Sequence, residues 1–198
     1  MYKTVLITLA EGYEDIEAVT AIDVLTRVGI KVTICGLKVR PVRGAYGSTI
    51  IGDTTIDKIE GEFDGLVFPG GLECARALAS EEKVVELVKN HHEKGKLIAA
   101  ICASSSLLLG EKCGLLKDIN ATGDPELMDV LAKSGAIICQ ESVVRDGNIV
   151  TGMGPGGAMR FSLALVEYLI GKSSANKLAD KWCIDIGTAA LSRITSAV

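Results

Sequence analysis

Cys102 stands where an apolar segment, residues 97–101, gives way at once to small residues and a second apolar segment. This order is typical of a nucleophile elbow, in which a tight turn between a strand and a helix exposes one reactive side chain. The free N–H groups and the dipole of the following helix favour an anion there. We therefore expect the Cys102 thiol to have a lowered pKa and to act as a nucleophile. The alternative is a buried, unreactive cysteine, which is how most free cysteines behave.

An acidic loop follows the first predicted strand, and Glu17 is its most informative member. Glu14 and Asp15 stand at a predicted helix start, where carboxylates stabilise the helix dipole. Glu17 lies one turn inside the helix among apolar neighbours, so an inward-pointing carboxyl group needs a partner. Facing Cys102, it would be protonated, because adjacent anions raise one of the two pKa values. A protonated Glu17 would donate a hydrogen bond to the thiolate and later relay a proton to substrate.

Two glycine-rich loops also leave predicted strands: Pro69-Gly70-Gly71, and the run over residues 152–157. Glycine lets backbone N–H groups approach a ligand closely, and two such groups can form an oxyanion hole. The second loop fits the G-x-G-x-x-G pattern of dinucleotide sites. No strand clearly follows its helix, however, so we interpret it as a tight turn.

The composition narrows the classes of protein to which the chain can belong. Its 198 residues are 48% hydrophobic with a mean hydropathy of +0.34, which suits one domain with a sizeable core. Charges or glycines interrupt every apolar run, so no segment is expected to cross a membrane. A strand pattern at residues 3–9 leaves no room for a signal peptide. The net charge of −4, without a basic cluster, argues against nucleic acid as a partner.

The six cysteines are scattered without a C-x-x-C pair, and the two histidines are adjacent. This distribution predicts no metal site. Reduced thiols in a cytoplasmic protein are the simplest interpretation.

Strand and helix patterns alternate along the chain. Strands are predicted over residues 5–9, 32–35, 65–68, 97–101 and 149–151, and helices over 16–28, 81–94, 104–113 and 159–170. In the first helix, an apolar stripe is expected to face the core: Ile16, Val19, Ile22, Val24 and Leu25. Short extra strands are expected at 49–51 and at 143–145, the latter in a hairpin through Asp146-Gly147. The alternation predicts a single-domain α/β fold, a doubly wound, mostly parallel sheet with helices on both faces.

Taken together, these motifs resemble the ThiJ/PfpI superfamily, and within it the Parkinsonism-associated branch, from Lys3 to about Lys172. The resemblance is carried by Glu14-Asp15-Ile16-Glu17-Ala18-Val19, Val32-Thr33-Ile34-Cys35-Gly36-Leu37, Phe68-Pro69-Gly70-Gly71, Ala99-Ala100-Ile101-Cys102-Ala103 and Gly154-Pro155-Gly156. It implies a flavodoxin-like fold and a homodimer. Residues 1–172 would form the family domain, which is like that of class I glutamine amidotransferases. Residues 173–198 would form a helical extension, with Leu178, Ala179, Trp182 and Ile186 on its apolar face.

The resemblance also implies the roles of individual residues. Cys102 would be the nucleophile and Glu17 its protonated partner. The backbone N–H groups of Gly71 and Ala103, next to Gly70, would form the oxyanion pocket. Family activities include cofactor-free glyoxalase action on methylglyoxal, proposed deglycation of glyoxal-modified proteins, and oxidation of the cysteine to a sulfinate. The expected substrate is thus a small 2-oxoaldehyde or a glycated molecule, with no cofactor.

Two departures from the family pattern leave three hypotheses open. Ala103 replaces the histidine that follows the cysteine in the protease branch, which argues against a cysteine protease. Asp124 stands where the other branch has a histidine, and it either replaces that histidine in catalysis or only caps a helix. The chain is then a glyoxalase or deglycase, a redox sensor or chaperone-like protein, or an inactive homologue.

His91 and His92 do not fill the place of the missing histidine. They end the helix before the strand at 97–101, so they lie at the amino edge of the sheet, about 15 Å from Cys102. We expect both to face solvent.

Overall fold

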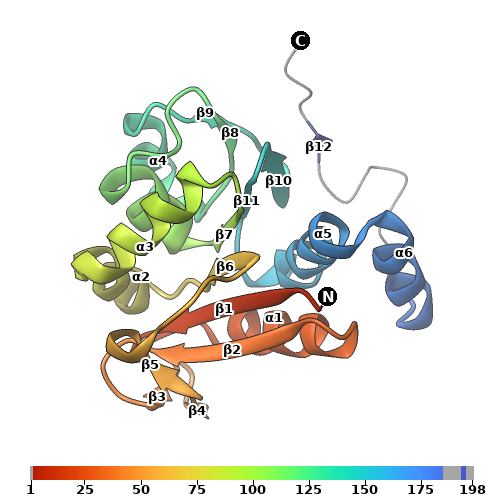
Figure 1. The fold of residues 1–198 in the computed structure, drawn as a ribbon. Coiled ribbons are helices and arrows are strands. Elements are labelled where there is room, and N and C mark those ends of the chain that lie inside the picture. Colours follow the sequence, from red (N-terminus) through yellow and green to blue (C-terminus); the bar gives the residue numbers. More distant parts are fainter. Residues whose placement is uncertain (1, 185–192, 195–198) are drawn as a thin grey trace.

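The predicted strands assemble into one central sheet in the computed structural model, which describes residues 2–184 and 193–194 (Figure 1). Within these residues the sheet has eight strands, in the spatial order β12 (Arg193–Ile194), β10 (Val143–Asp146), β11 (Ile149–Gly152), β7 (Leu97–Ile101), β6 (Gly65–Phe68), β1 (Thr4–Leu9), β2 (Lys31–Gly36) and β5 (Thr54–Thr55). The pairs are parallel except β10 and β11, which form the predicted antiparallel hairpin. The central order β2-β1-β6-β7-β11 is that of a flavodoxin-like fold.

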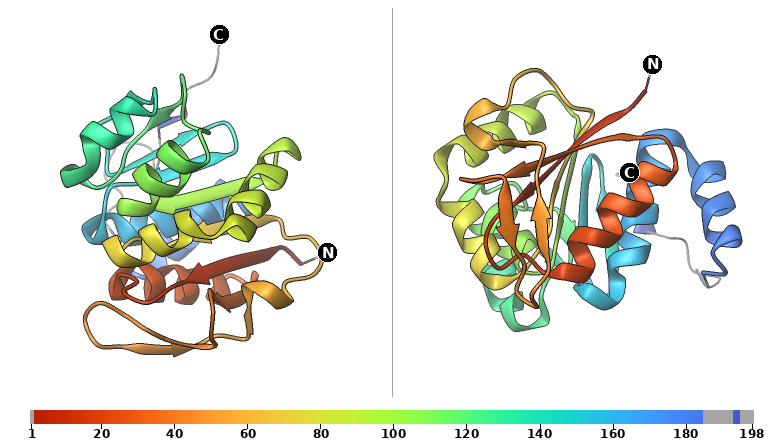
Figure 2. Two further views of the ribbon diagram at one scale, coloured as in Figure 1. Left: turned by 90° about the vertical axis from the view of Figure 1, so that its left-hand side faces the viewer. Right: turned by 90° about the horizontal axis from the view of Figure 1, so that it is seen from below.

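Helices cover both faces of the sheet, as Figure 2 shows from below in its right-hand view. One face carries α1 (Asp15–Arg27), α5 (Ala158–Ile170) and α6 (Lys172–Lys181). The other carries α2 (Leu72–Ser80), α3 (Glu82–Glu93), the π-helix η2 (Ser105–Lys112) and α4 (Met128–Lys133). Three short 3-10 turns complete the helices: η1 (Ile56–Lys58), η3 (Pro125–Leu127) and η4 (Pro155–Gly157). None of the helices in the described part of the chain is both long and apolar enough to span a bilayer.

The middle strands of the sheet are buried along their whole length. Every residue of β6, β7 and β11 is buried, and so is all of β1 after Thr4. A parallel sheet covered on both faces demands such continuous apolar runs, because neither face of a strand meets water. One contiguous hydrophobic cluster joins the sheet to the helices. The predicted single-domain, doubly wound α/β fold is therefore confirmed.

Two small sheets lie outside the central one. β3 (Pro41–Arg43) pairs antiparallel with β4 (Thr49–Ile51), and β8 (Asn120–Ala121) pairs parallel with β9 (Ile137–Ile138). The predicted strand at 49–51 is thus confirmed as β4. The Asp15 carboxylate accepts the backbone N–H groups of Tyr46 and Ser48, each at 3.0 Å, and so docks this hairpin onto the start of α1.

The apolar stripe predicted for α1 is only half right. Val24 and Leu25 are buried, whereas Ile16 and Val19 are 56% and 49% exposed. The helix has turned its other side inward, where the buried residues are Glu17, Ala18, Ala21, Val24 and Leu25. α1 packs against α5, and small side chains on the buried side allow this close approach. Periodicity alone favoured the bulkier residues.

The predicted C-terminal helix is α6, which packs against α5. Leu178 and Ala179 are buried as expected, and Trp182 is partly buried with the Arg27 guanidinium 5.0 Å from its ring centre. Ile186 lies outside the described residues. A domain boundary at residue 172 stays a prediction.

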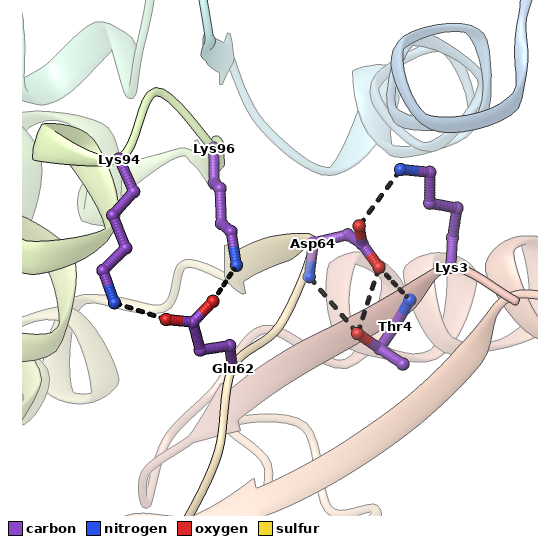
Figure 3. A network of polar contacts seen from close by, with 6 residues as sticks. All are labelled: Lys3, Thr4, Glu62, Asp64, Lys94 and Lys96. Atoms are coloured by element: carbon purple, nitrogen blue, oxygen red, sulfur yellow. Dashed lines mark hydrogen bonds and ion pairs between the residues drawn. The ribbon is translucent and has the colours of Figure 1, made fainter. Parts of the chain in front are cut away.

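Charged residues join three chain segments at the amino edge of the sheet (Figure 3). The Glu62 carboxylate accepts hydrogen bonds from Lys94 at 2.6 Å and Lys96 at 2.8 Å, and these bonds lower its pKa to about 2. Asp64 binds the Lys3 ammonium at 3.0 Å and the backbone N–H of Thr4 at 2.8 Å. The starts of β1, β6 and β7 are therefore held together by exposed ion pairs.

His91 lies buried beside this edge and is only 6% exposed, so the expectation that it faces solvent is wrong. Its neighbour His92 is half-buried. The end of α3 packs down onto the sheet, which removes water from the His91 ring. This burial, together with the charges of Lys96 and Lys94, lowers the pKa of His91 to about 4. Its Nε2 atom has no hydrogen-bond partner among the described residues.

We expect His91 to make the protein less stable in acid. The unfolded chain protonates this residue near pH 6.5, but the folded chain does so only near pH 4. As the pH is lowered from 6.5 to 4, the free energy of unfolding of the wild type should therefore decrease by up to about 3 kcal/mol relative to that of His91→Gln. Urea unfolding of both proteins between pH 4 and 7 measures this difference. A difference that does not change with pH would contradict the prediction.

Candidate active site

Cys102 occupies a strained turn directly after β7. Its φ of 59° is in the left-handed region, which a side chain disfavours. Its N–H donates to the carbonyl of Gly152 at 2.8 Å, and η2 begins three residues later. Two small residues lock the turn, since the Ser104 hydroxyl donates to the Pro69 carbonyl at 2.6 Å and the Ser105 hydroxyl donates to that of Ala100 at 3.0 Å. The structure thus has the strand-to-helix elbow that the sequence predicts.

Gly70 and Gly71 bring the loop after β6 against this turn. A Cβ atom on Gly70 would lie 2.5 Å from Cys102 Cβ and 2.7 Å from Glu17 Oε2, so only glycine fits. Gly71 has a φ of 85°, and a Cβ there would lie 2.1 Å from the carbonyl oxygen of Gly12. The N–H of Gly70 donates to Glu17 Oε2 at 2.7 Å. Gly70 therefore positions Glu17, and the expectation that it belongs to the oxyanion pocket needs this correction.

Glu17 is held inside the protein by the first turn of α1. The Glu14 carboxylate caps this helix by accepting the N–H of Glu17 at 2.8 Å. The Glu17 side chain is 1% exposed, and its Oε1 atom has no hydrogen-bond partner within the described residues. Burial raises the pKa of Glu17 to about 8. The group is therefore mostly protonated at neutral pH, with one O–H to donate, in agreement with the sequence argument.

The Cys102 sulfur is partly exposed, and some of the groups around it raise its pKa while others lower it. Burial raises the pKa of the thiol, and the nearby carboxyl groups of Glu17 and Asp124 raise it further. Backbone N–H groups of Ala103 and Gly71 bind the sulfur and lower the pKa by less. Cys102 is therefore a thiol at neutral pH, and the expectation of a lowered pKa is wrong. That argument counted the helix dipole but not the burial or the two carboxyl groups.

Asp124 caps a helix and also contacts the Cys102 sulfur. Its Oδ2 atom lies 3.6 Å from Cys102 Sγ and accepts the S–H hydrogen. Its Oδ1 atom accepts the N–H of Glu126 at 3.0 Å and so caps η3. The loop that carries it is tied to β11, because the N–H of Thr122 donates to the Thr151 hydroxyl at 3.0 Å. A helix cap thus fixes the orientation of a carboxylate that faces the sulfur.

The comparisons with known proteins agree with this geometry. The sequence model of the DJ-1/PfpI family matches residues 3–168. The chain belongs to the DJ-1/PfpI family.

Individual members of the family resemble the chain over most of its length. It is 39% identical over 179 residues to Protein DJ-1 homolog A of Arabidopsis thaliana, covering 89% of this chain but only 45% of that longer relative. It is 33% identical to the glutathione-independent glyoxalase DJR-1.2 of Caenorhabditis elegans, covering 92% of this chain and 97% of the relative. The crystal structure of Drosophila melanogaster DJ-1beta superposes with a TM-score of 0.87 at 35% identity, covering 93% and 99% of the two chains.

The loop over residues 152–157 meets this DJ-1/PfpI site through the Gly152 carbonyl, which accepts the Cys102 N–H. Its remaining residues form a tight turn in which the N–H of Gly157 donates to the Gly154 carbonyl at 2.8 Å. A Cβ on Gly154 or Gly156 would meet no atom within 4 Å. Among the described residues, no group of three or more His, Cys, Asp or Glu side chains is placed to hold a metal ion.

His91 and His92 lie at the amino edge of the sheet, and Cys102 follows the carboxyl end of β7. The three buried cysteines, Cys35, Cys74 and Cys113, have pKa values raised by burial to about 12, 12 and 11. Sequence reasoning had given Glu14 only a dipole role and had passed over the hydroxyls of Ser104 and Ser105. A triple serine directly after a predicted nucleophile was the available signal for the last two.

Proposed function

We propose that this chain is a cofactor-independent glyoxalase that converts methylglyoxal, or a related small 2-oxoaldehyde, to the 2-hydroxy acid. The observation that carries this proposal is the contact between the Cys102 thiol and the Asp124 carboxylate, with a protonated Glu17 beside them. This set contains a nucleophile, a base and an acid within reach of one small molecule. The glyoxalase name of the Caenorhabditis elegans relative supports the same chemistry. Removal of glyoxal adducts from proteins would use the same first step.

In the first step, the Cys102 sulfur attacks the aldehyde carbon of methylglyoxal. A C–S bond forms, and the S–H proton passes to Asp124 Oδ2, which already accepts that hydrogen. The electron pair of the carbonyl bond moves to its oxygen. The N–H groups of Gly71 and Ala103 stabilise this oxyanion, and Glu17 donates its proton to it. The product is a neutral hemithioacetal.

The second step moves a hydrogen between the two carbons. The Glu17 carboxylate, now ionised, removes the proton from the former aldehyde carbon while Asp124 gives its proton to the ketone oxygen, and an enediol forms. Glu17 then returns its proton to the neighbouring carbon, Asp124 takes the O–H proton from the former aldehyde carbon, and the product is a lactoyl thioester on Cys102. Water then attacks the thioester and gives a proton to Glu17, the C–S bond breaks, Asp124 returns a proton to the sulfur, and lactic acid leaves. The sum is methylglyoxal plus water to lactic acid, which needs no oxidant and no glutathione.

The product of the reaction tests the proposal directly. Purified full-length chain with methylglyoxal, and without glutathione, should consume the aldehyde over many turnovers and release an equal amount of lactate. A loss of aldehyde that stops after one equivalent per chain, without lactate, would contradict the proposal. It would show that the site binds aldehydes but does not turn them over.

Asp124→Asn should change two rates in opposite directions. Asparagine caps helices as well as aspartate does, so η3 should keep its cap. Loss of the charge lowers the pKa of the Cys102 thiol, so alkylation by iodoacetamide at neutral pH should accelerate about tenfold. Loss of the base should lower kcat/KM for methylglyoxal about 10²-fold.

The matched control is Asp129→Asn, which removes an exposed carboxylate from the first turn of α4. It should change neither rate. If alkylation and turnover both fell in Asp124→Asn, the assigned role of Asp124 would be wrong.

A further inference from the structure

The hydrogen-bonding groups around the Cys102 sulfur are unevenly distributed. The N–H groups of Gly71 and Ala103 are donors. Glu17, which is mostly protonated because its pKa is raised to about 8, has an O–H that can donate as well. Asp124 Oδ2, at 3.6 Å, is an acceptor and is the carboxylate oxygen that receives the S–H hydrogen. It cannot turn away freely, because Oδ1 of the same carboxylate caps η3. On the side that faces Asp124, a group attached to the sulfur must therefore donate a hydrogen bond to be stabilised.

This asymmetry bears on oxidation of the sulfur by hydrogen peroxide. In the first oxidation, the sulfur attacks one peroxide oxygen, the O–O bond breaks, and the thiol becomes a sulfenic acid with release of water. In the second, the sulfenic sulfur attacks another peroxide molecule in the same way and becomes a sulfinic acid, again with release of water. Each step oxidises sulfur by two electrons and reduces one peroxide. The sulfinic acid is ionised at neutral pH, whereas the sulfenic acid can remain neutral.

The two products fit the site differently. A sulfenic acid carries one O–H, which can donate to Asp124 Oδ2 in place of the original S–H. A sulfinate has two oxygens, a negative charge and no hydrogen. The donors of Gly71, Ala103 and Glu17 can serve one of these oxygens, but the other would meet the Asp124 carboxylate. Two anions at that separation, without a proton between them, repel each other strongly in a partly buried site.

We propose that oxidation of Cys102 by hydrogen peroxide stops at the sulfenic acid, because Asp124 accepts its O–H and opposes the sulfinate anion. The modification is then reversible. A low-molecular-weight thiol condenses with the sulfenic acid to a mixed disulfide and water, and a second thiol molecule releases the Cys102 thiol. This proposal rests on the proposed function, because it describes how oxidation inactivates the same nucleophile and how a thiol restores it. Oxidation of Cys102 would then end one step before the sulfinate that the family resemblance implies.

The test compares the full-length wild type with Asp124→Asn under excess hydrogen peroxide. Mass spectrometry of the Cys102 peptide follows the species with one and with two added oxygen atoms, and a carbon nucleophile specific for sulfenic acids traps the first. The wild type should accumulate the trapped species and recover its thiol after addition of glutathione. Asp124→Asn should pass to the sulfinate at least about tenfold faster, the factor that corresponds to one unit of pKa.

Asp129→Asn again serves as the matched control and should behave as the wild type does. The inference is overturned if the wild type reaches the sulfinate as fast as Asp124→Asn, if Asp129→Asn produces the same acceleration, or if Cys102 gains no oxygen at all. Methylglyoxal turnover is measured on the same preparations before peroxide is added. Failure of the proposed function therefore appears in the unoxidised sample, and failure of this inference appears only in the oxidised one.

Discussion

Replacing Cys102 with serine is expected to lower methylglyoxal turnover by at least about 10³-fold, the scale seen when an essential nucleophile is removed. A hydroxyl is a far weaker nucleophile than a thiol and is much harder to ionise. The fold should persist, because serine is nearly the same size and can donate the same hydrogen bond to Asp124 Oδ2. Steady-state lactate production, with far-ultraviolet circular dichroism as the check on folding, measures the effect.

The control is Cys139→Ser, which changes another partly exposed cysteine outside the site. It should leave turnover within a factor of about two, because no step of the mechanism uses that sulfur. Turnover that survives in Cys102→Ser but falls in Cys139→Ser would show that the nucleophile has been assigned to the wrong residue.

Replacing Glu17 with glutamine should stabilise the protein at neutral and alkaline pH. The pKa of Glu17 is about 8 in the folded chain, against an ordinary value of 4.5. Between these values the folded state holds a proton that the unfolded chain has released, so rising pH favours unfolding. The wild type should therefore lose up to about 4 kcal/mol relative to Glu17→Gln between pH 4.5 and 8. Glutamine keeps an acceptor for the Gly70 N–H, so the loop after β6 should stay in place.

Urea unfolding at several pH values measures this slope, and Glu73→Gln, which removes an exposed carboxylate near the start of α2, should not change it. The slope from Glu17 has the opposite sign to that from His91, and the two overlap between pH 4.5 and 6.5. Each therefore has to be measured as a difference from its own variant. Equal pH dependence in the wild type and Glu17→Gln would mean that Glu17 is ionised in the folded protein.

Much of the fold follows from patterns that are local in the sequence. The strands at 65–68 and 97–101 were predicted to the residue, because strands buried on both faces of a parallel sheet are unbroken apolar runs. The elbow at Cys102 follows for a similar reason, since a strand, a nucleophile and small residues are adjacent. β8 and β9 were missed, because two-residue strands show no periodicity.

The errors concern properties that depend on distant residues. The pKa of Cys102 depends on Asp124, 22 positions further along the chain, and on Glu17, which lies far earlier in the sequence, in α1. The burial of His91 depends on how α3 meets the sheet, and the exposure of Ile16 depends on the contact between α1 and α5. These contacts join residues that are far apart in the sequence, so a local sequence pattern cannot predict them.

The left-handed backbone conformation of Cys102 lowers the stability of the fold at the position that carries the proposed nucleophile. Any residue with a Cβ pays about 1 kcal/mol for that conformation, whereas glycine adopts it freely. The fold would therefore gain from losing its nucleophile. In a laboratory population selected only for thermal resistance, codon 102 should be among the early ones to drift, toward glycine or asparagine. If cysteine is retained at position 102 in such a population, growth of the cells depends on the reactivity of its thiol.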